Sequence, residues 1–244
     1  MDDMALFSDS PQEEEFALCL LGPYSPYRWL AFPKTAPSMA ELVQAECCTP
    51  HDAERWNRVY VSFLSALAPG DTKRLVLKSP VHMFRMRRLQ KLFPRAQFIH
   101  IVREPVAMLA STFKLWRSLL RTQAFSQISD EDLLQRILGD CNAAYADFEQ
   151  AKPLIPPGHL CEIYHEDLVA KPTAVLRQIY EQLDLGEPNL VAPRLLTYLK
   201  QMQAYRHRAY DLTEDQLRQI NKAARPLAER YGYKQKTSTA ICGD

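Results

Sequence analysis

The sequence predicts an α/β protein with a short parallel sheet flanked by helices. Two Val- and Ile-containing apolar runs, Leu75–Leu77 and Phe98–Val102, have the composition of buried strands. Between them, apolar residues recur at helical spacing, namely Met83, Met86, Leu89 and Phe93. This order of strand, helix and strand is a βαβ unit, from which parallel sheets are built.

Each predicted strand ends in a cation that is followed closely by a proline, in Lys78-Ser79-Pro80 and in Arg103-Glu104-Pro105. Proline favours the first helical position and Ser79 is a suitable N-cap, so we expect both helices to begin at the carboxyl ends of parallel strands. Ligands of open α/β sheets bind beyond these ends, where helix N-termini offer free N–H groups. The pattern predicts a site for phosphate or sulfate. Either cation taken alone is also compatible with a solvated strand end.

The N-terminal segment predicts a short helix that begins at Pro11, with Ser10 as its N-cap. Its apolar side is expected to consist of Phe16, Leu20 and Leu21. The first turn carries three acids, Glu13-Glu14-Glu15. Two interpretations remain open: one acid, for which we select Glu14, is the general base of a reaction, or all three only complement the helix dipole.

The rest of the chain continues the alternation of helices with one further strand. Leu160–Tyr164 is predicted as the third strand. Further helices are predicted over Met39–Cys47, His51–Leu67, Asp130–Lys152, Pro172–Leu183, Leu190–Ala204 and Thr213–Tyr231. The last of them has an N-cap at Thr213 and a C-terminal stop at Gly232.

Length and composition favour a single domain with one sizeable core, because 47% of the 244 residues are hydrophobic. We expect this domain to span residues 1–233 and residues 234–244 to form a flexible tail. A net charge of +1 gives no argument for a nucleic-acid partner, although the excess of cations in residues 51–100 suits an anionic ligand. The basic run Arg85–Lys91 fits a solvated helix face equally well.

The six cysteines show no CxxC pair and no Cys/His spacing typical of a metal site. Without a signal peptide they are expected to be reduced thiols of a cytoplasmic protein. No apolar run approaches the roughly twenty residues that span a bilayer, so no membrane span is expected. The oligomeric state is left open.

The central stretch resembles the sulfotransferases that use 3′-phosphoadenosine 5′-phosphosulfate (PAPS), and in particular their bacterial-type branch. The resemblance lies in the LKSPxH pattern at Leu77–His82, the FPxAxFIHIxRxP pattern at Phe93–Pro105 and the serine at Ser111. The segments Asp9–Glu15 and Ser25–Tyr27 resemble further parts of that branch. The resemblance implies a P-loop-like three-layer fold. It also implies transfer of a sulfuryl group from PAPS to a hydroxyl or amine of a small-molecule, carbohydrate or lipid acceptor, with the adenosine bisphosphate PAP as product and no metal.

The resemblance assigns roles to residues at the two strand ends. Arg103 and Ser111 would hold the 3′-phosphate of PAPS, and Lys78 would approach the transferring sulfuryl group. Glu104 stands where the family usually has aspartate, which keeps the charge. Cytosolic members place a catalytic histidine two residues after the lysine, where this chain has Pro80. His82, four residues after Lys78, is therefore a separate candidate for acid–base work.

Two later segments also resemble the family. Tyr164–Leu168 resembles a YEDL segment near the adenine, with His165 where the tyrosine is usual; Glu166 and Asp167 either contact the ligand or cap the next helix. Tyr205–Tyr210 resembles a basic loop that approaches the nucleotide, in which Arg206 and Arg208 are phosphate ligands or remain exposed to solvent.

One family feature is absent from the sequence. PAPS sulfotransferases begin with a strand and a PRSGTT-type loop that binds the 5′-phosphosulfate, whereas none of the seven glycines here precedes Gly22. We therefore expect the N-terminal strand and phosphate loop to be missing. Two functions remain open: a PAPS-dependent sulfotransferase, or a truncated, non-catalytic module that retains a 3′-phosphate pocket.

Overall fold

The computed structural model describes residues 12–22, 25–43, 49–68, 70, 74–202 and 212–234. The chain folds into two compact units. The first unit comprises residues 1–94 and 115–151, and the second comprises residues 95–114 and 152–244. Helix α6 contributes its first half to the second unit and its second half to the first.

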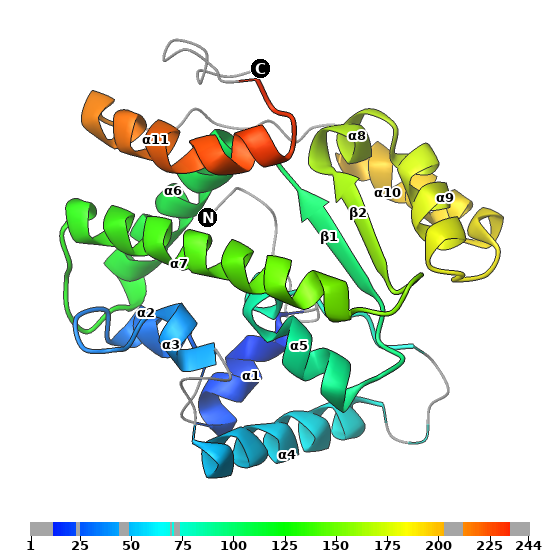
Figure 1. The fold of residues 1–244 in the computed structure, drawn as a ribbon, viewed down its shortest axis with the longest axis horizontal. Coiled ribbons are helices and arrows are strands. Elements are labelled where there is room, and N and C mark those ends of the chain that lie inside the picture. Colours follow the sequence, from blue (N-terminus) through cyan, green and yellow to red (C-terminus); the bar gives the residue numbers. More distant parts are fainter. Residues whose placement is uncertain are drawn as a thin grey trace. The chain divides into compact units, whose positions relative to one another are not determined.

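The first unit is helical wherever it has regular structure in its described part (Figure 1). Its elements are α1 (Glu14–Leu21), α2 (Arg28–Ala31), α3 (Met39–Val43), α4 (Pro50–Leu67), α5 (His82–Leu92), the second half of α6 (Pro105–Gln123) and α7 (Asp130–Ala151). Helix α5 packs against α7, α3 contacts both, and α4 lies against α1. The core of this unit is therefore made by helix packing.

Helix α4 shows how the sequence specifies these elements. The Thr49 side chain accepts a hydrogen bond from the backbone N–H of Asp52, and Pro50 occupies the first turn, so the helix has a defined start. Its buried residues Trp56, Tyr60 and Leu64 follow one another at four-residue spacing. The predicted helix His51–Leu67 is confirmed with a start one residue earlier.

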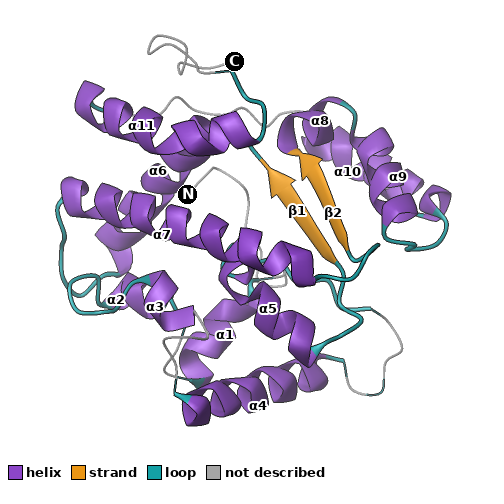
Figure 2. Cartoon of the chain, in the orientation of Figure 1, coloured by secondary structure: helices purple, strands orange, loops and turns teal. Residues whose placement is uncertain are grey.

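The second unit contains the sheet (Figure 2). Strands β1 (Phe98–Val102) and β2 (Leu160–Tyr164) are parallel, with Phe98 opposite Leu160 and Val102 opposite Tyr164. The other elements of this unit are the first half of α6, α8 (His165–Ala170), α9 (Pro172–Gln182), α10 (Ala192–Met202), α11 (Glu214–Arg230) and the 3-10 turns η2 (Lys152–Leu154) and η3 (Pro188–Leu190). The predicted α/β class with a short parallel sheet is confirmed, as are the limits of both strands.

Helix α9 covers one face of β2. Cys161 and Ile163 point to this face and are buried against Val175, Ile179 and Leu183. Both ends of helix α11 have strong capping signals. Thr213 and Gln216 form a capping box at the start of α11, and Gly232, with φ 72°, follows its end.

The predicted first strand, Leu75–Leu77, does not form. Residues 74–79 have no regular secondary structure, and Val76 is 88% exposed. Three apolar residues form too short a run to compete for a place in a sheet, and the parallel partner of β1 is instead β2, reached through α6 and α7. The predicted pairing of Leu75–Leu77 with β1 is therefore wrong within the described residues.

One helix start and one helix face also differ from prediction. Helix α5 begins at His82, because Ser79 and Pro80 form a turn in which the Ser79 hydroxyl accepts from the N–H of Val81. In α1 the buried residues are Glu14, Glu15 and Leu18. The side expected to be buried is exposed to solvent, namely Phe16 (47%), Leu20 (90%) and Leu21 (53%). Ser10 and Pro11 lie outside the described residues.

Candidate functional site

Three consecutive acids at the start of α1 contact three basic side chains that follow one another at helical spacing. The pairs are Glu13–Lys78, Glu14–His82 and Glu15–Arg85. The basic residues are four and three residues apart, so each successive acid meets the next basic residue along the chain. The exposed fraction falls along the series, from 81% for the Lys78 side chain to 18% for His82 and 1% for Arg85.

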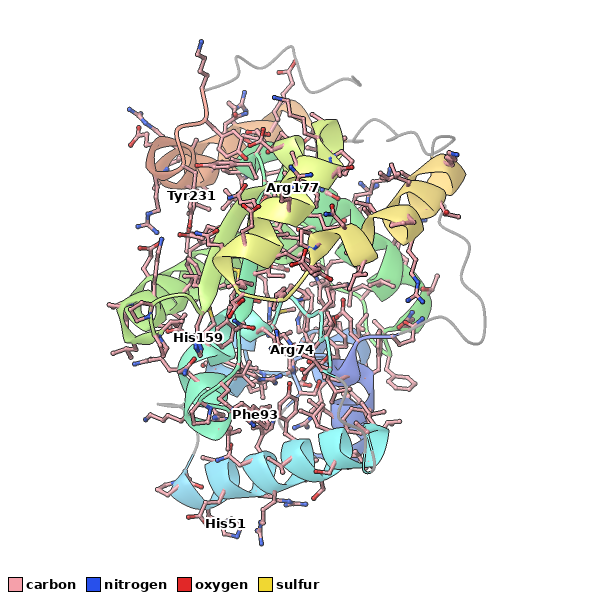
Figure 3. All side chains as sticks on the ribbon, turned by 90° about the vertical axis from the view of Figure 1, so that its right-hand side faces the viewer. His51, Arg74, Phe93, His159, Arg177 and Tyr231 are labelled. Atoms are coloured by element: carbon pink, nitrogen blue, oxygen red, sulfur yellow. The ribbon has the colours of Figure 1, made fainter. Side chains whose placement is uncertain are left out.

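The Arg85–Glu15 pair is the buried anchor of this series. The two Arg85 Nη atoms contact the two carboxylate oxygens of Glu15 at 2.5 and 3.2 Å. The guanidinium also lies 4.8 Å from the ring centroid of Trp56. The Trp56 ring stacks on that of Tyr60, which in turn packs against the ring of Phe93, labelled in Figure 3. Of the two interpretations of the basic run, a solvated face is wrong for Arg85.

The Glu14–His82 pair is a largely buried contact between a carboxylate and an imidazole. His82 Nε2 lies 2.8 Å from Glu14 Oε1, and the glutamate is 5% exposed. Burial tends to raise the pKa of Glu14, but the hydrogen bond and charge of His82 outweigh it and leave the pKa below its ordinary value. The other ring nitrogen, Nδ1, is shielded from solvent and lacks a hydrogen-bond partner within the described part of the chain. Glu14 thus lies within ion-pair distance of one ring nitrogen of His82.

Lys78 is the solvent-facing member of the series. Its ammonium contacts Glu13 Oε1, while Glu13 Oε2 accepts a hydrogen bond from the Tyr27 hydroxyl. The predicted catalytic residues Glu14, Lys78 and His82 therefore lie together in the first unit. An exposed cation beside a histidine can bind an anion and exchange a proton.

The second unit contains the predicted 3′-phosphate ligands. Arg103 directly follows β1, and Ser111 lies in the second turn of α6. Between them, the Glu104 carboxylate accepts from the backbone N–H groups of Val106 (3.1 Å) and Ala107 (2.7 Å) and so caps α6. This explains why glutamate is tolerated at this position: its side chain reaches two of the free N–H groups of the helix.

Glu166 fixes the backbone next to Arg103. Its Oε1 accepts from the Glu104 N–H at 3.0 Å, and its Oε2 accepts from the Tyr233 hydroxyl at 2.7 Å. Burial acts to raise the pKa of Glu166, but these two hydrogen bonds prevail and lower it. Glu166 thus has a structural role in supporting the end of β1. Arg206 and Arg208 lie outside the described residues.

Sequence reasoning missed Tyr27 and did not separate the roles of Glu13 and Glu15. The available signal was a run of three adjacent acids together with three basic residues at helical spacing, at positions 78, 82 and 85. Among the residues that the structure describes, no group of three or more His, Cys, Asp and Glu side chains is arranged to hold a metal ion. No described helix is both long enough and apolar enough to cross a membrane.

Comparison with known proteins places this chain in a family. The sequence model of the Sulfotransferase family matches residues 24–189. The chain is 33% identical over 237 residues to proteins named omega-hydroxy-beta-dihydromenaquinone-9 sulfotransferase Stf3, from Mycobacterium bovis and from Mycobacterium tuberculosis. These alignments cover 97% of this chain and 61% of each relative. The chain belongs to the sulfotransferase family, and it spans about three fifths of the length of these relatives.

A solved structure supports the same fold. The crystal structure of sulfotransferase STF9 from Mycobacterium avium matches with a TM-score of 0.60 and 20% sequence identity. The match covers 93% of this chain and 58% of the other. At this level of identity the likeness concerns the fold.

Proposed function

We propose that this chain transfers a sulfuryl group from PAPS to the hydroxyl group of a lipid-like acceptor. The observation that carries the proposal is the placement of an exposed Lys78 and of His82 on one short segment, with Glu14 of α1 lying 2.8 Å from the histidine. Membership of the sulfotransferase family supports a nucleotide sulfate donor. The name of the 33% identical relatives supports a hydroxylated, lipid-like acceptor.

In the proposed reaction, the acceptor oxygen attacks the sulfur atom while the bond from sulfur to the 5′-phosphate oxygen of PAPS breaks. Lys78 stabilises the negative charge on the sulfuryl oxygens, and Arg103 with Ser111 binds the 3′-phosphate. His82 accepts the proton of the acceptor hydroxyl. Glu14 stabilises the resulting imidazolium at Nε2.

The exposed side of α1 supports an apolar acceptor. Phe16, Leu20 and Leu21 are 47%, 90% and 53% exposed, although they begin only one residue after the acids of the site. Apolar side chains that remain exposed next to a reactive group favour binding of an apolar ligand. We assign this surface to the hydrocarbon part of the acceptor.

Two measurements test the donor side. Calorimetric titration with PAP should show binding by the wild type and at least about tenfold weaker binding by Arg103→Ala, because a charge-assisted contact to phosphate is lost. Mass spectrometry should then detect sulfate transfer from PAPS to a long-chain alcohol. Binding of PAP without any transfer would support the non-catalytic module instead, and absence of binding would contradict both functions.

The acceptor side is tested by Leu20→Ser, with Leu190→Ser at an exposed leucine of η3 as the matched control. Loss of apolar contact should raise KM for a long-chain alcohol about fivefold or more in Leu20→Ser and leave a short-chain alcohol unaffected. Equal effects of the two substitutions would show that α1 does not bind the acceptor.

A further inference from the structure

The carboxylate of Glu13 connects a cationic side chain, Lys78, to an aromatic one, Tyr27. Its Oε1 contacts the ammonium of Lys78, and its Oε2 accepts a hydrogen bond from the phenol of Tyr27. The Lys78 side chain is 81% exposed, whereas that of Glu13 is 16% exposed. A long, exposed lysine ordinarily samples many rotamers, so a fixed partner decides where its charge is found.

Tyr27 is itself held by its surroundings. Its ring packs 4.9 Å from that of Phe16 and 6.2 Å from that of Trp116, between centroids, and its backbone N–H donates to Ser25 Oγ at 3.1 Å. Burial, together with the hydrogen bond and charge of Glu13, raises the pKa of Tyr27 well above its ordinary value. The phenol therefore remains a donor to Glu13 throughout the physiological range.

We propose that Glu13 and Tyr27 are positioning residues that hold the Lys78 ammonium in place for the sulfuryl group. The inference rests on the proposed function. An ammonium has three N–H donors, so the contact with Glu13 leaves two for sulfuryl oxygens. Tyr27 acts on the reaction only through Glu13, and Glu13 acts only through Lys78. Prior fixing of the charge lowers the reorganisation needed in the transition state.

If Tyr27 acts through Glu13 and Glu13 acts through Lys78, the variants should show a specific pattern of kinetics. Tyr27→Phe keeps the ring and removes the donor, and Glu13→Gln keeps the shape and removes the charge. Each should lower kcat about tenfold and change KM for PAPS less than about twofold, because positioning affects the transition state more than ground-state binding. The double variant should be no slower than Glu13→Gln alone, since Tyr27 has no separate route to the reaction. Tyr198→Phe, at an exposed tyrosine of α10, is the control for loss of a phenol and should match the wild type.

The possible outcomes separate this inference from the proposed function. Absence of transfer by the wild type would refute the function itself. If the wild type does transfer sulfate, any of three results would overturn the positioning role. These are multiplicative losses of kcat in the double variant, a change mainly in KM, and an unchanged kcat in both single variants. A rise in kcat for Glu13→Gln would show that Glu13 restrains Lys78 and would also overturn it. Thermal melts of all variants identify losses of activity caused by unfolding. If Tyr27→Phe is unfolded, Glu13→Gln is instead introduced into both the wild-type and the Lys78→Ala proteins. Glu13→Gln should have no effect on kcat when Lys78 is absent.

Discussion

The side chain of Lys78 reaches the protein surface from a segment without regular secondary structure, and ion pairing rather than strand geometry fixes it. Replacement by alanine removes the charge but no buried contact. We therefore expect Lys78→Ala to lower kcat by about 100-fold, with little change in unfolding temperature, because the charge acts on the transition state. Steady-state kinetics and a thermal melt check this. An unchanged kcat would remove Lys78 from the proposed mechanism.

The Glu14 carboxyl makes stability depend on pH in a defined direction. Its pKa in the folded protein lies below the ordinary value of 4.5, so its contribution to stability is complete above that value and is lost as the pH falls through the folded pKa. Glu14→Gln has no group to titrate there. The difference in unfolding free energy between wild type and variant should thus be largest near neutral pH and shrink below pH 4.5. Urea unfolding across this range measures it, and a difference independent of pH would contradict the assignment.

Substitution of two glycines, one within a helix and one just after a helix, should have opposite effects on stability. Gly232 adopts φ 72° after α11, whereas Gly139 lies within α7, and an added Cβ meets no atom within 4 Å at either position. Gly232→Ala should destabilise the protein by about 1 kcal/mol through backbone strain. Gly139→Ala, the matched control, should stabilise it by about 0.5–1 kcal/mol through helix propensity. Destabilisation by both substitutions would indicate that α7 does not have regular helical geometry at Gly139.

Elements with strong local signals were predictable from sequence, and elements decided by distant contacts were not. The run Phe98–Val102 and the capping box at Thr213 carry their own information, and both are found as predicted. The burial of Glu14 and Glu15 in α1 depends on His82 and Arg85, which lie about 70 residues away, so the apolar side of the helix was expected in the wrong place. For the site, residue types at Lys78 and His82 pointed to the proposed chemistry, but only coordinates show that Tyr27 is linked to Lys78 through Glu13.

At the scale of the whole molecule, we expect stability to depend more on the buried pair of Glu15 and Arg85 than on an exposed pair such as that of Arg225 and Glu229. Glu15 and Arg85 have side chains that are 0% and 1% exposed, and removal of one partner leaves an uncompensated buried charge. Glu15→Gln should cost about 3–5 kcal/mol. Glu229→Gln, which removes the exposed i,i+4 pair with Arg225, should cost less than about 0.5 kcal/mol. Chemical denaturation of both variants makes the comparison, and similar small costs would mean that the first pair is hydrated in solution.

The Glu166 carboxylate has a consequence for how the protein is handled. It is bonded on one side to the residue after Arg103 and on the other to Tyr233, three positions beyond the last helix. A shortened version that stopped at residue 230 would retain all the helices and strands that the structure describes and yet lose a hydrogen bond to the carboxylate that supports the backbone next to Arg103. Any shortening from the carboxyl end should accordingly spare position 233, and a fusion partner is better attached after it than in its place.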